Sequence, residues 1–321
     1  MLNSPRIERD AVRWKTDILF FSIIIPTYNR PAKLTGCLQS LECLDYPRDR
    51  FEVVVVNDGS ENPVEPVVSS FSNRLNITLL TQSHSGPAMA RNKGAMHAKG
   101  EFLAFTDDDC TPAPEWLKTL AVRFHGTPGK MIGGRTLNAL LHNPYSTASD
   151  LLIRYLYAHY NRDPDQACFF ASNNLTLSKE SFHQIGGFDT AFLHAGAEDR
   201  EFCERWLRRG FRMTYAPEVL IYHAHQLTLQ SFCRQQFNYG RGAFRFHQLR
   251  AGGRLDRLRL EPLSFYVNML RYPLSEIQGP KKYLVLGLII LSQGATATGF
   301  LWQMLRHLTK ENGQTCSSGA T

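Results

Sequence analysis

Residues 20–30, FFSIIIPTYNR, set the expected fold of this chain. An apolar, β-branched run closed by Pro26 predicts a short buried strand that ends in a polar turn. The same arrangement returns at residues 51–60, FEVVVVNDGS, and at residues 101–110, EFLAFTDDDC. Each apolar run therefore predicts a buried strand with a polar cluster at its carboxyl end.

Segments with helical periodicity separate these runs. Residues 30–44 place Leu34, Leu38 and Leu41 on one face, and residues 86–98 are rich in alanine. Buried strands that alternate with helices predict an α/β fold with a parallel sheet covered on both faces. Ligands bind such sheets beyond the carboxyl ends of the strands, so we expect the three polar clusters to share one site.

The rest of the chain predicts shorter elements and a reducing environment. We expect helices at residues 63–71, 114–124, 149–160, 198–209 and 227–249, and strands at residues 76–81, 131–136, 211–216 and 219–222. Seven cysteines without regular spacing, and a polar N-terminus without the apolar stretch of a secretory signal, favour a cytoplasmic protein.

Positive charge is concentrated towards the C-terminus. From Gln226 onward the chain has 12 Lys and Arg against 4 Asp and Glu, whereas its formal net charge is +7. This suits nucleic acid or an anionic membrane, and because no nucleic-acid-binding module is recognisable we favour the membrane. Residues 283–305 form an apolar segment of 23 residues. A spanning helix, an interfacial helix and a buried packing helix remain open for it.

The three aspartates Asp107, Asp108 and Asp109 follow a predicted buried strand. Adjacent carboxylates raise each other's pKa values unless a counter-charge is present, and Mg²⁺ or Mn²⁺ supplies one through oxygen ligands. Asp107 and Asp109 lie two apart on an extended segment, so both side chains can face the same side. Taken alone, the cluster fits a solvated acidic turn better than a metal site.

The motifs in their order resemble glycosyltransferase family 2. The donor-binding half of that family is matched by SIIIPTYNR (22–30), FEVVVVNDGS (51–60), GPAMARNKG (86–94) and EFLAFTDDDC (101–110), and the acceptor half by residues 197–225, which begin AEDREFCERW. The resemblance covers about two-thirds of the chain. It implies a GT-A fold, which is a Rossmann-like, mostly parallel sheet flanked by helices, here with a helical C-terminal extension. It also implies a nucleoside-diphosphate sugar donor and inversion at the anomeric carbon.

The resemblance divides the chain into parts. An N-terminal extension (1–17) precedes a catalytic domain (18–226), with a donor-binding half (18–135) and an acceptor half (136–226). A basic helical region (227–321) follows, which we expect to be peripheral at the inner face of the membrane, with a single C-terminal span as an alternative.

Individual roles are carried over onto matching positions. The donor-binding set implied by the resemblance is Pro26, Thr27, Tyr28, Arg30, Asp58, Arg91, Asp107, Asp108 and Asn173. Within it, Pro26, Thr27 and Tyr28 would line the nucleobase site and Asp58 would hold the base. Arg91 would approach the base or the diphosphate.

The resemblance also implies the metal ligands and the base. Asp109 would ligate the metal, and Asp107 would contact the ribose or serve as a second ligand. His223 would be a third ligand or contact a phosphate, although a structural histidine is an equal alternative. The implied catalytic residues are Asp199 and Glu198, at a predicted helix N-terminus. Asp199 would be the general base, since the helix dipole favours its anion. The alternative role for Asp199 is a helix cap.

One missing signature refines the expected function. The Gln-x-x-Arg-Trp signature of processive synthases is absent from residues 235–242, QQFNYGRG, which favours transfer of one sugar per encounter. We therefore expect transfer from a UDP-sugar to a hydroxyl of a glycan or lipid-linked glycan, as in cell-surface polysaccharide synthesis. Alternatives are a sugar-phosphate nucleotidyltransferase, which would need a Gly-rich loop near residues 26–30, and a catalytically dead nucleotide- or membrane-binding module.

Overall fold

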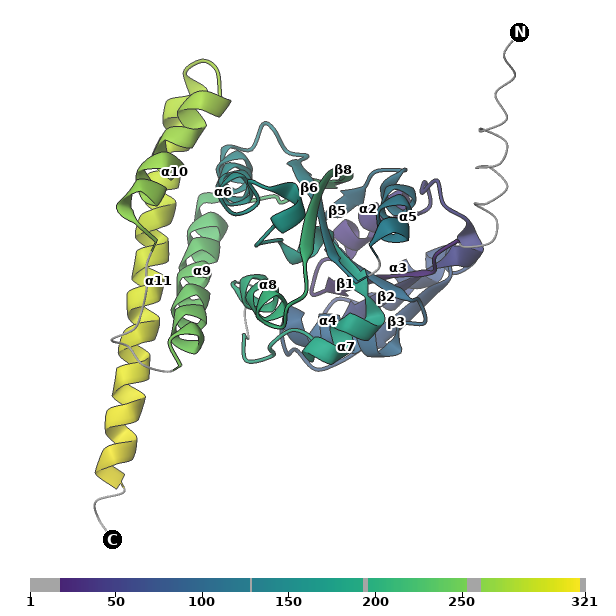
Figure 1. Cartoon of the computed structure of the whole chain (residues 1–321), viewed down its shortest axis with the longest axis horizontal. Helices are drawn as coiled ribbons and strands as arrows, with labels where there is room; N and C mark the ends of the chain where they lie inside the picture. The colour runs from purple at the N-terminus through teal and green to yellow at the C-terminus, as the bar shows by residue number, and fades with distance from the viewer. Residues whose placement is uncertain (1–17, 128, 193–195, 253–260, 318–321) are drawn as a thin grey trace.

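The computed structural model describes residues 18–127, 129–192, 196–252 and 261–317, with side chains as far as residue 309. An α/β body lies beside a group of long C-terminal helices (Figure 1). The body contains one eight-stranded sheet with the strand order β3-β2-β1-β4-β7-β6-β8-β5. Residues 1–17, expected to be an N-terminal extension, lie outside the described residues.

The first four strands are parallel, as predicted. They are β1 (Phe21–Thr27), β2 (Phe51–Asn57), β3 (Ile77–Thr81) and β4 (Phe102–Phe105). Every residue of β1 and β2 is buried because helices cover both faces of the sheet. One face packs against α2 (Pro31–Leu41), α3 (Glu65–Phe71) and α5 (Trp116–Gly126), and the other packs against α4 (Pro87–His97).

The second half of the sheet is mixed in direction. β7 (Leu175–Ser178) runs antiparallel to β4 and to β6 (Met131–Asn138), and β5 (Cys110–Pro112) runs antiparallel to β8 (Met213–His223), whereas β6 and β8 are parallel. The two strands predicted at 211–216 and 219–222 are one strand. A register shift opposite Gly134 and Arg135 absorbs the residues between them, so the separation into two strands was wrong.

Helices of the second half cover the face that α4 covers. They are α6 (Pro144–Tyr160), α7 (Lys179–Ile185) and α8 (Glu198–Arg208), and the short 3-10 segments are Arg48–Arg50, Pro164–Gln166 and Ser172–Asn174. Helix α6 begins five residues before the predicted residue 149. Asn143 caps it by accepting hydrogen bonds from the Tyr145 and Ser146 N–H groups, and Pro144 occupies its first turn.

The C-terminal region is helical. It consists of α9 (Leu229–Arg250), α10 (Leu263–Glu276) and α11 (Lys281–Ser317), and α9 lies between α11 and the body (Figure 1). Helices α9 and α11 approach closely at two glycines. A Cβ atom on Gly240 would lie 1.9 Å from the carbonyl oxygen of Thr296, and one on Gly299 would lie 2.0 Å from that of Phe237.

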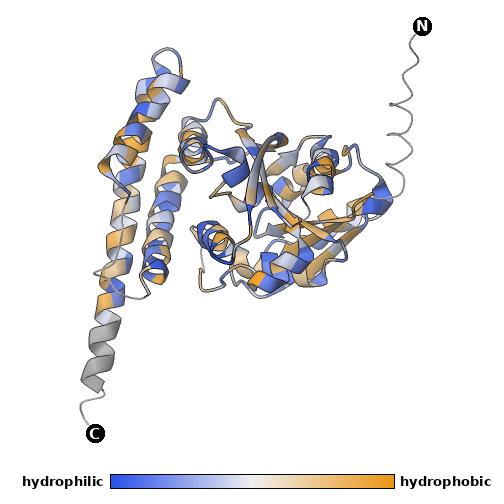
Figure 2. Cartoon of the chain, in the orientation of Figure 1, coloured by the Kyte–Doolittle hydropathy of each residue, from blue (hydrophilic) through white to orange (hydrophobic). Residues whose placement is uncertain are grey.

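Helix α11 is apolar along much of its length (Figure 2). By length and composition, Lys281–Thr309 is the one helix among the described residues that is long and apolar enough to cross a membrane. Only 28% of its most apolar window is buried against the protein. The alternative of a buried packing helix therefore does not fit α11.

Candidate active site

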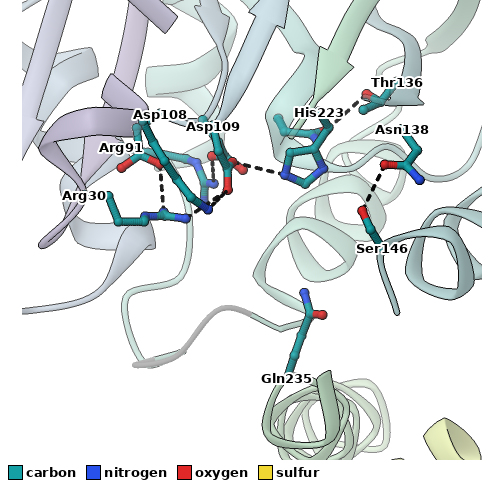
Figure 3. A network of polar contacts seen from close by, with 12 residues as sticks. Arg30, Arg91, Asp108, Asp109, Thr136, Asn138, Ser146, His223 and Gln235 are labelled. Carbon is teal, nitrogen blue, oxygen red and sulfur yellow. Dashed lines mark hydrogen bonds and ion pairs between the residues drawn. The ribbon is translucent and has the colours of Figure 1, made fainter. Parts of the chain in front are cut away.

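The predicted polar clusters converge at one edge of the sheet. The carboxyl ends of β1, β2 and β4 deliver Thr27, Asp58 and the three aspartates, and β8 ends beside them at His223. Figure 3 shows Asp108, Asp109 and His223 together with Arg30 and Arg91. The convergence of the three polar clusters, which the strand ends predicted, is therefore confirmed.

Asp108 points into the protein. It is fully buried, its Oδ2 accepts a hydrogen bond of 2.7 Å from the Thr27 hydroxyl, and its Oδ1 lies 3.0 Å from Arg30 Nη2. Burial raises its pKa to about 7, against the opposing charge of Arg30. These contacts hold the end of β1 against the end of β4, so Asp108 anchors the two strand ends to each other.

Asp109 lies at the centre of a charged cluster. Its Oδ1 lies 3.1 Å from His223 Nε2, and its Oδ2 lies 3.1 Å from Arg30 Nη1 and 3.0 Å from Lys33 Nζ. Burial alone would raise the pKa of Asp109, but the hydrogen bond and charge of His223, with Arg30 and Lys33, lower it below its ordinary value. Asp109 is therefore an anion throughout the physiological range.

Asp107 is held by a different cation. Arg91 of α4 is buried, and its Nη2 lies 2.7 Å from Asp107 Oδ1 while its Nη1 lies 3.3 Å from Glu198 Oε1. One guanidinium thus joins the aspartate cluster to the start of α8. The family resemblance implied that Arg91 approaches the base or the diphosphate, but it gave no sign of the pairing of Arg91 with Glu198, 107 positions away.

Asp109 and His223 offer two ligand atoms to a divalent cation. Two ligands at about 2.1 Å from a metal and at right angles to each other lie about 3.0 Å apart, and the observed separation is 3.1 Å. Cys110 is the third member of this group of atoms. Burial raises the pKa of its thiol well above the ordinary value, and thiolates suit softer metals, so Cys110 does not fit Mg²⁺ or Mn²⁺. The group does not include Asp107.

The start of α8 presents Asp199 with a raised pKa. Gly196 and Ala197 have φ values of 148° and 71°, and Glu198 Oε2 accepts a hydrogen bond of 2.7 Å from the Gly196 N–H. Asp199 Oδ1 accepts a bond from the Arg200 N–H, and Ala197, not Asp199, is the N-cap residue. Burial and the neighbouring Glu198 charge raise the pKa of Asp199 to about 7. Asp199 is therefore not the N-cap residue, although its carboxylate does accept a hydrogen bond from a backbone N–H of the first helical turn.

Asp58 holds a loop in place. Its carboxylate accepts hydrogen bonds from Gln82 Nε2 (2.7 Å), from the Ser85 N–H (2.9 Å) and from the Gly86 N–H (2.9 Å). The ring of His84 in that loop stacks on the ring of Tyr28, with centroids 4.1 Å apart. Tyr28 is 37% exposed, so the pair presents an open aromatic edge near Asp58.

The remaining predicted residues are less exposed. Pro26 is buried within β1, and the hydroxyl of Thr27 is used on Asp108. Asn173 is 9% exposed and its Oδ1 accepts a hydrogen bond of 3.4 Å from the Thr136 hydroxyl. Sequence reasoning missed Lys33 and His84. Lys33 lies one helical turn after Arg30, and this spacing is the signal that would have found it.

Helix α9 forms the floor below the Asp199 loop. A Cβ on Gly242 would lie 2.0 Å from the Gly196 carbonyl oxygen, and Gly196 also packs against Tyr239. Gln235 of α9 is directed towards the site in Figure 3, and its Oε1 has no hydrogen-bond partner among the described residues. Helix α9 is thus in direct contact with the loop that carries Asp199.

Comparison with known proteins identifies relatives of this arrangement. A family model described as glycosyl transferase family 2 matches residues 22–186, and one described as the N-terminal domain of galactosyltransferase matches residues 157–227. The glycosyltransferase AglE of Haloferax volcanii is 26% identical over 70% of this chain and 72% of its own length. The pre-mycofactocin glycosyltransferase of Mycobacterium tuberculosis is 29% identical over 69% of this chain, which spans 46% of that protein.

Solved structures with the same fold include a mannosyltransferase. PcManGT from Pyrobaculum calidifontis, in complex with GDP-Man and Mn²⁺, superimposes with a TM-score of 0.61 at 20% identity, covering 92% of this chain and 94% of the other. S. aureus TarS 1-349, in complex with UDP-GlcNAc, gives a TM-score of 0.52 at 18% identity over 88% of this chain and 89% of TarS.

Proposed function

Because this chain belongs to glycosyltransferase family 2 and has the GT-A fold, we propose that it is an inverting, non-processive transferase with Asp199 as its base. The donor would be a UDP-sugar, and the acceptor a hydroxyl of a glycan or lipid-linked glycan. One observation carries the proposal. Buried Arg91 contacts both Asp107 and Glu198, which supports a position for the start of α8, where Asp199 follows Glu198, beside the donor aspartates.

Direct displacement requires few groups. Asp199 accepts the proton of the acceptor hydroxyl, and that oxygen forms a bond to the anomeric carbon from the face opposite the diphosphate. The bond between the anomeric carbon and the diphosphate oxygen breaks, and the nucleoside diphosphate leaves with the electron pair. No covalent sugar–enzyme intermediate is needed. A carboxyl with a pKa of about 7 is matched to this task at neutral pH.

Cations around the aspartates suit a diphosphate. Arg30 and Lys33 lie within 3.1 Å of Asp109, and both side chains are partly exposed, so they are available to phosphate oxygens. Asp109 and His223 would hold Mg²⁺ or Mn²⁺, which supplies positive charge against the leaving diphosphate when bound. The exposed ring pair of Tyr28 and His84 offers a stacking surface for the base.

The proposal includes the nucleotide of the donor and the location of the protein in the cell. The family resemblance and the TarS complex with UDP-GlcNAc favour UDP as the donor nucleotide. Because PcManGT binds GDP-Man, GDP-sugars are the alternative donors to test. The basic C-terminal region supports a place at the cytoplasmic face of an anionic membrane. A lipid-linked acceptor would be available there.

The proposal is tested by supplying UDP- and GDP-sugars with Mn²⁺ and following nucleoside diphosphate release. Release of UDP from a UDP-sugar that rises with an added glycan acceptor is expected. Asp109→Ala should abolish the metal-dependent rate and weaken Mn²⁺ binding measured by calorimetry, whereas Asp45→Ala, an exposed aspartate that pairs with Lys118 on the surface, should change neither.

Other outcomes separate the alternatives. Pyrophosphate release from UTP and a sugar phosphate would indicate a nucleotidyltransferase. Nucleotide binding with no turnover for any donor or acceptor would indicate a dead module. Full metal-dependent activity in Asp109→Ala would contradict the metal assignment.

A further inference from the structure

Helix α11 presents a row of leucines, interrupted by small residues, on its exposed side. The exposed positions at alternating spacings of three and four residues are Leu284, Gly287, Leu291, Gly294, Thr298, Leu301 and Leu305. This spacing places all of them on one face of an α-helix. Leu284 is 56% exposed and Leu305 is 59% exposed, so the row is open at both ends. An apolar surface of this length marks a binding surface.

The opposite side of α11 is occupied by protein. Val285, Leu288 and Ile289 are buried in a cluster with residues of α6 and α10, and Gly299 packs against the backbone of α9. Helix α9 in turn packs against the body at Gly196. Lipid can therefore reach only the outer side of α11.

This packing argues against a membrane span. If α11 crossed a bilayer, α9 beside it would enter the hydrocarbon with its charged residues, among them Arg234 and Arg241. Loops and open sheet edges do not occur in contact with lipid tails, so the body could not follow. A helix lying in the membrane plane meets neither difficulty.

Cations without carboxylate partners lie at both ends of the row. Lys281 and Lys282 precede it, and Lys282 Nζ lies 5.3 Å from the centre of the Tyr283 ring. At the other end, the Cζ atoms of Arg241, which belongs to α9, and of Arg306 lie 4.8 Å and 4.7 Å from the centre of the Trp302 ring. These four cations form no salt bridge with a carboxylate of the described residues. Aromatic rings beside cations suit the headgroup region of an anionic bilayer.

Helix α10 adds a second exposed row. Leu263, Val267 and Leu274 are 78%, 36% and 40% exposed, and with Arg271 they share one helical face. Apolar and basic residues are again combined.

We propose that α11, with α10, seats this protein on an anionic membrane with the α11 axis in the membrane plane and the Leu284–Leu305 row at the acyl boundary. The inference extends the membrane part of the proposed function. It does not depend on sugar transfer, since binding is measured without substrates and either proposal can fail alone.

Depth-dependent fluorescence quenching tests the orientation. Leu284→Trp, Gly294→Trp and Leu305→Trp would each be made in the full chain carrying Trp302→Phe, and mixed with vesicles of equal phosphatidylcholine and phosphatidylglycerol. Lipids with a quencher near the headgroup or near the chain end report the depth. Leu284 and Leu305 are about 31 Å apart along a helix, so a span would place Gly294 near the bilayer centre. The in-plane arrangement predicts equal, shallow quenching at all three positions.

An exposed position on the body provides the control for this experiment. Leu141→Trp, at a residue that is 73% exposed on the body, should not be quenched beyond the Trp302→Phe parent. Deep quenching at Gly294 with shallow quenching at the ends would overturn the in-plane proposal, as would the absence of vesicle binding.

Charge substitution tests the surface itself. The double substitution Leu291→Asp and Leu305→Asp should reduce co-sedimentation with anionic vesicles at least tenfold, whereas the matched Leu141→Asp should not, and all variants should keep wild-type circular dichroism. Unchanged co-sedimentation would contradict the proposal. A stable dimer in sedimentation velocity that the double substitution dissociates would instead assign the row to a second copy of this chain.

Discussion

Asp199 has a raised pKa, and no side chain of the described residues donates a hydrogen bond to its carboxylate, so the carboxylate is available to a substrate proton. Asp199→Asn keeps the shape but cannot accept the proton. We expect turnover to fall by about 10²- to 10⁴-fold, with donor affinity within a factor of about two of wild type because the aspartates near the diphosphate are untouched. Turnover assays and donor titration calorimetry measure the two effects. Normal transfer by this variant would eliminate Asp199 as the base.

The pKa of Asp199 also predicts a pH dependence. The base acts when deprotonated, so kcat/KM should rise with pH, level off above about 7, and fall about tenfold for each pH unit below that value. Folding is affected in the opposite direction, because a carboxyl whose folded pKa is raised destabilises the native state where it is ionised. Asp199→Asn should therefore melt at a higher temperature than wild type at pH 8, with the difference vanishing below about pH 4. A lower melting temperature at pH 8 would contradict the burial argument.

At the residue scale, the sequence predicted which side chains meet but not their partners. The run of three aspartates predicted a charged site, and the structure divides it among Thr27, Arg30, Lys33 and Arg91. These pairings depend on side chains from separate strands and helices. No local pattern in the sequence records them, so the anchoring contacts of Asp108 could not be predicted.

At the scale of elements, the glycine contacts between α9 and α11 have a measurable consequence. A side chain at Gly299 would collide with the Phe237 carbonyl, whereas Gly294 on the same helix has no atom within 4 Å. Gly299→Leu should lower the free energy of unfolding by about 1–3 kcal/mol through overpacking. Gly294→Leu should leave it unchanged or raise it, because leucine has the higher helix propensity. Thermal and urea unfolding compare the pair, and equal stability of both variants would show that the contact is not tight.

Strong periodic runs predicted their elements, and short ones did not. The apolar runs of β1, β2 and β4 were found within one residue because burial on both faces leaves an unbroken apolar pattern. Strand β5 has three residues and β7 has four, and both exist because β8, β4 and β6 pair with them. Helices α7 and α10 were also missed. Whether such short elements form depends on pairing with segments that are distant in the sequence, and local propensity carries no information about that pairing.

At the scale of the whole molecule, the charge is divided between two regions. The region from Gln226 onward carries an excess of eight positive charges, while the body is close to neutral. Binding to anionic vesicles should therefore weaken as salt rises from about 0.1 M to about 1 M, where the screening length falls to about 3 Å. A residual fraction should persist through the apolar row. Vesicle flotation across this salt range measures both parts, with neutral vesicles as the control, and binding insensitive to salt would contradict the electrostatic part.

Helix α9 has a consequence for the length of the product. It lies between α11 and the Gly196 loop, so a membrane on the outer side of α11 would be separated from Asp199 by both helices, about two helix diameters or roughly 20 Å. The distance between the membrane and the base would then select the acceptor by its length. A hydroxyl carried at that height above the acyl boundary meets the base, and once a sugar has been added the new chain end extends beyond it. Termination after one addition would follow from where the enzyme is seated, without any device that senses the product.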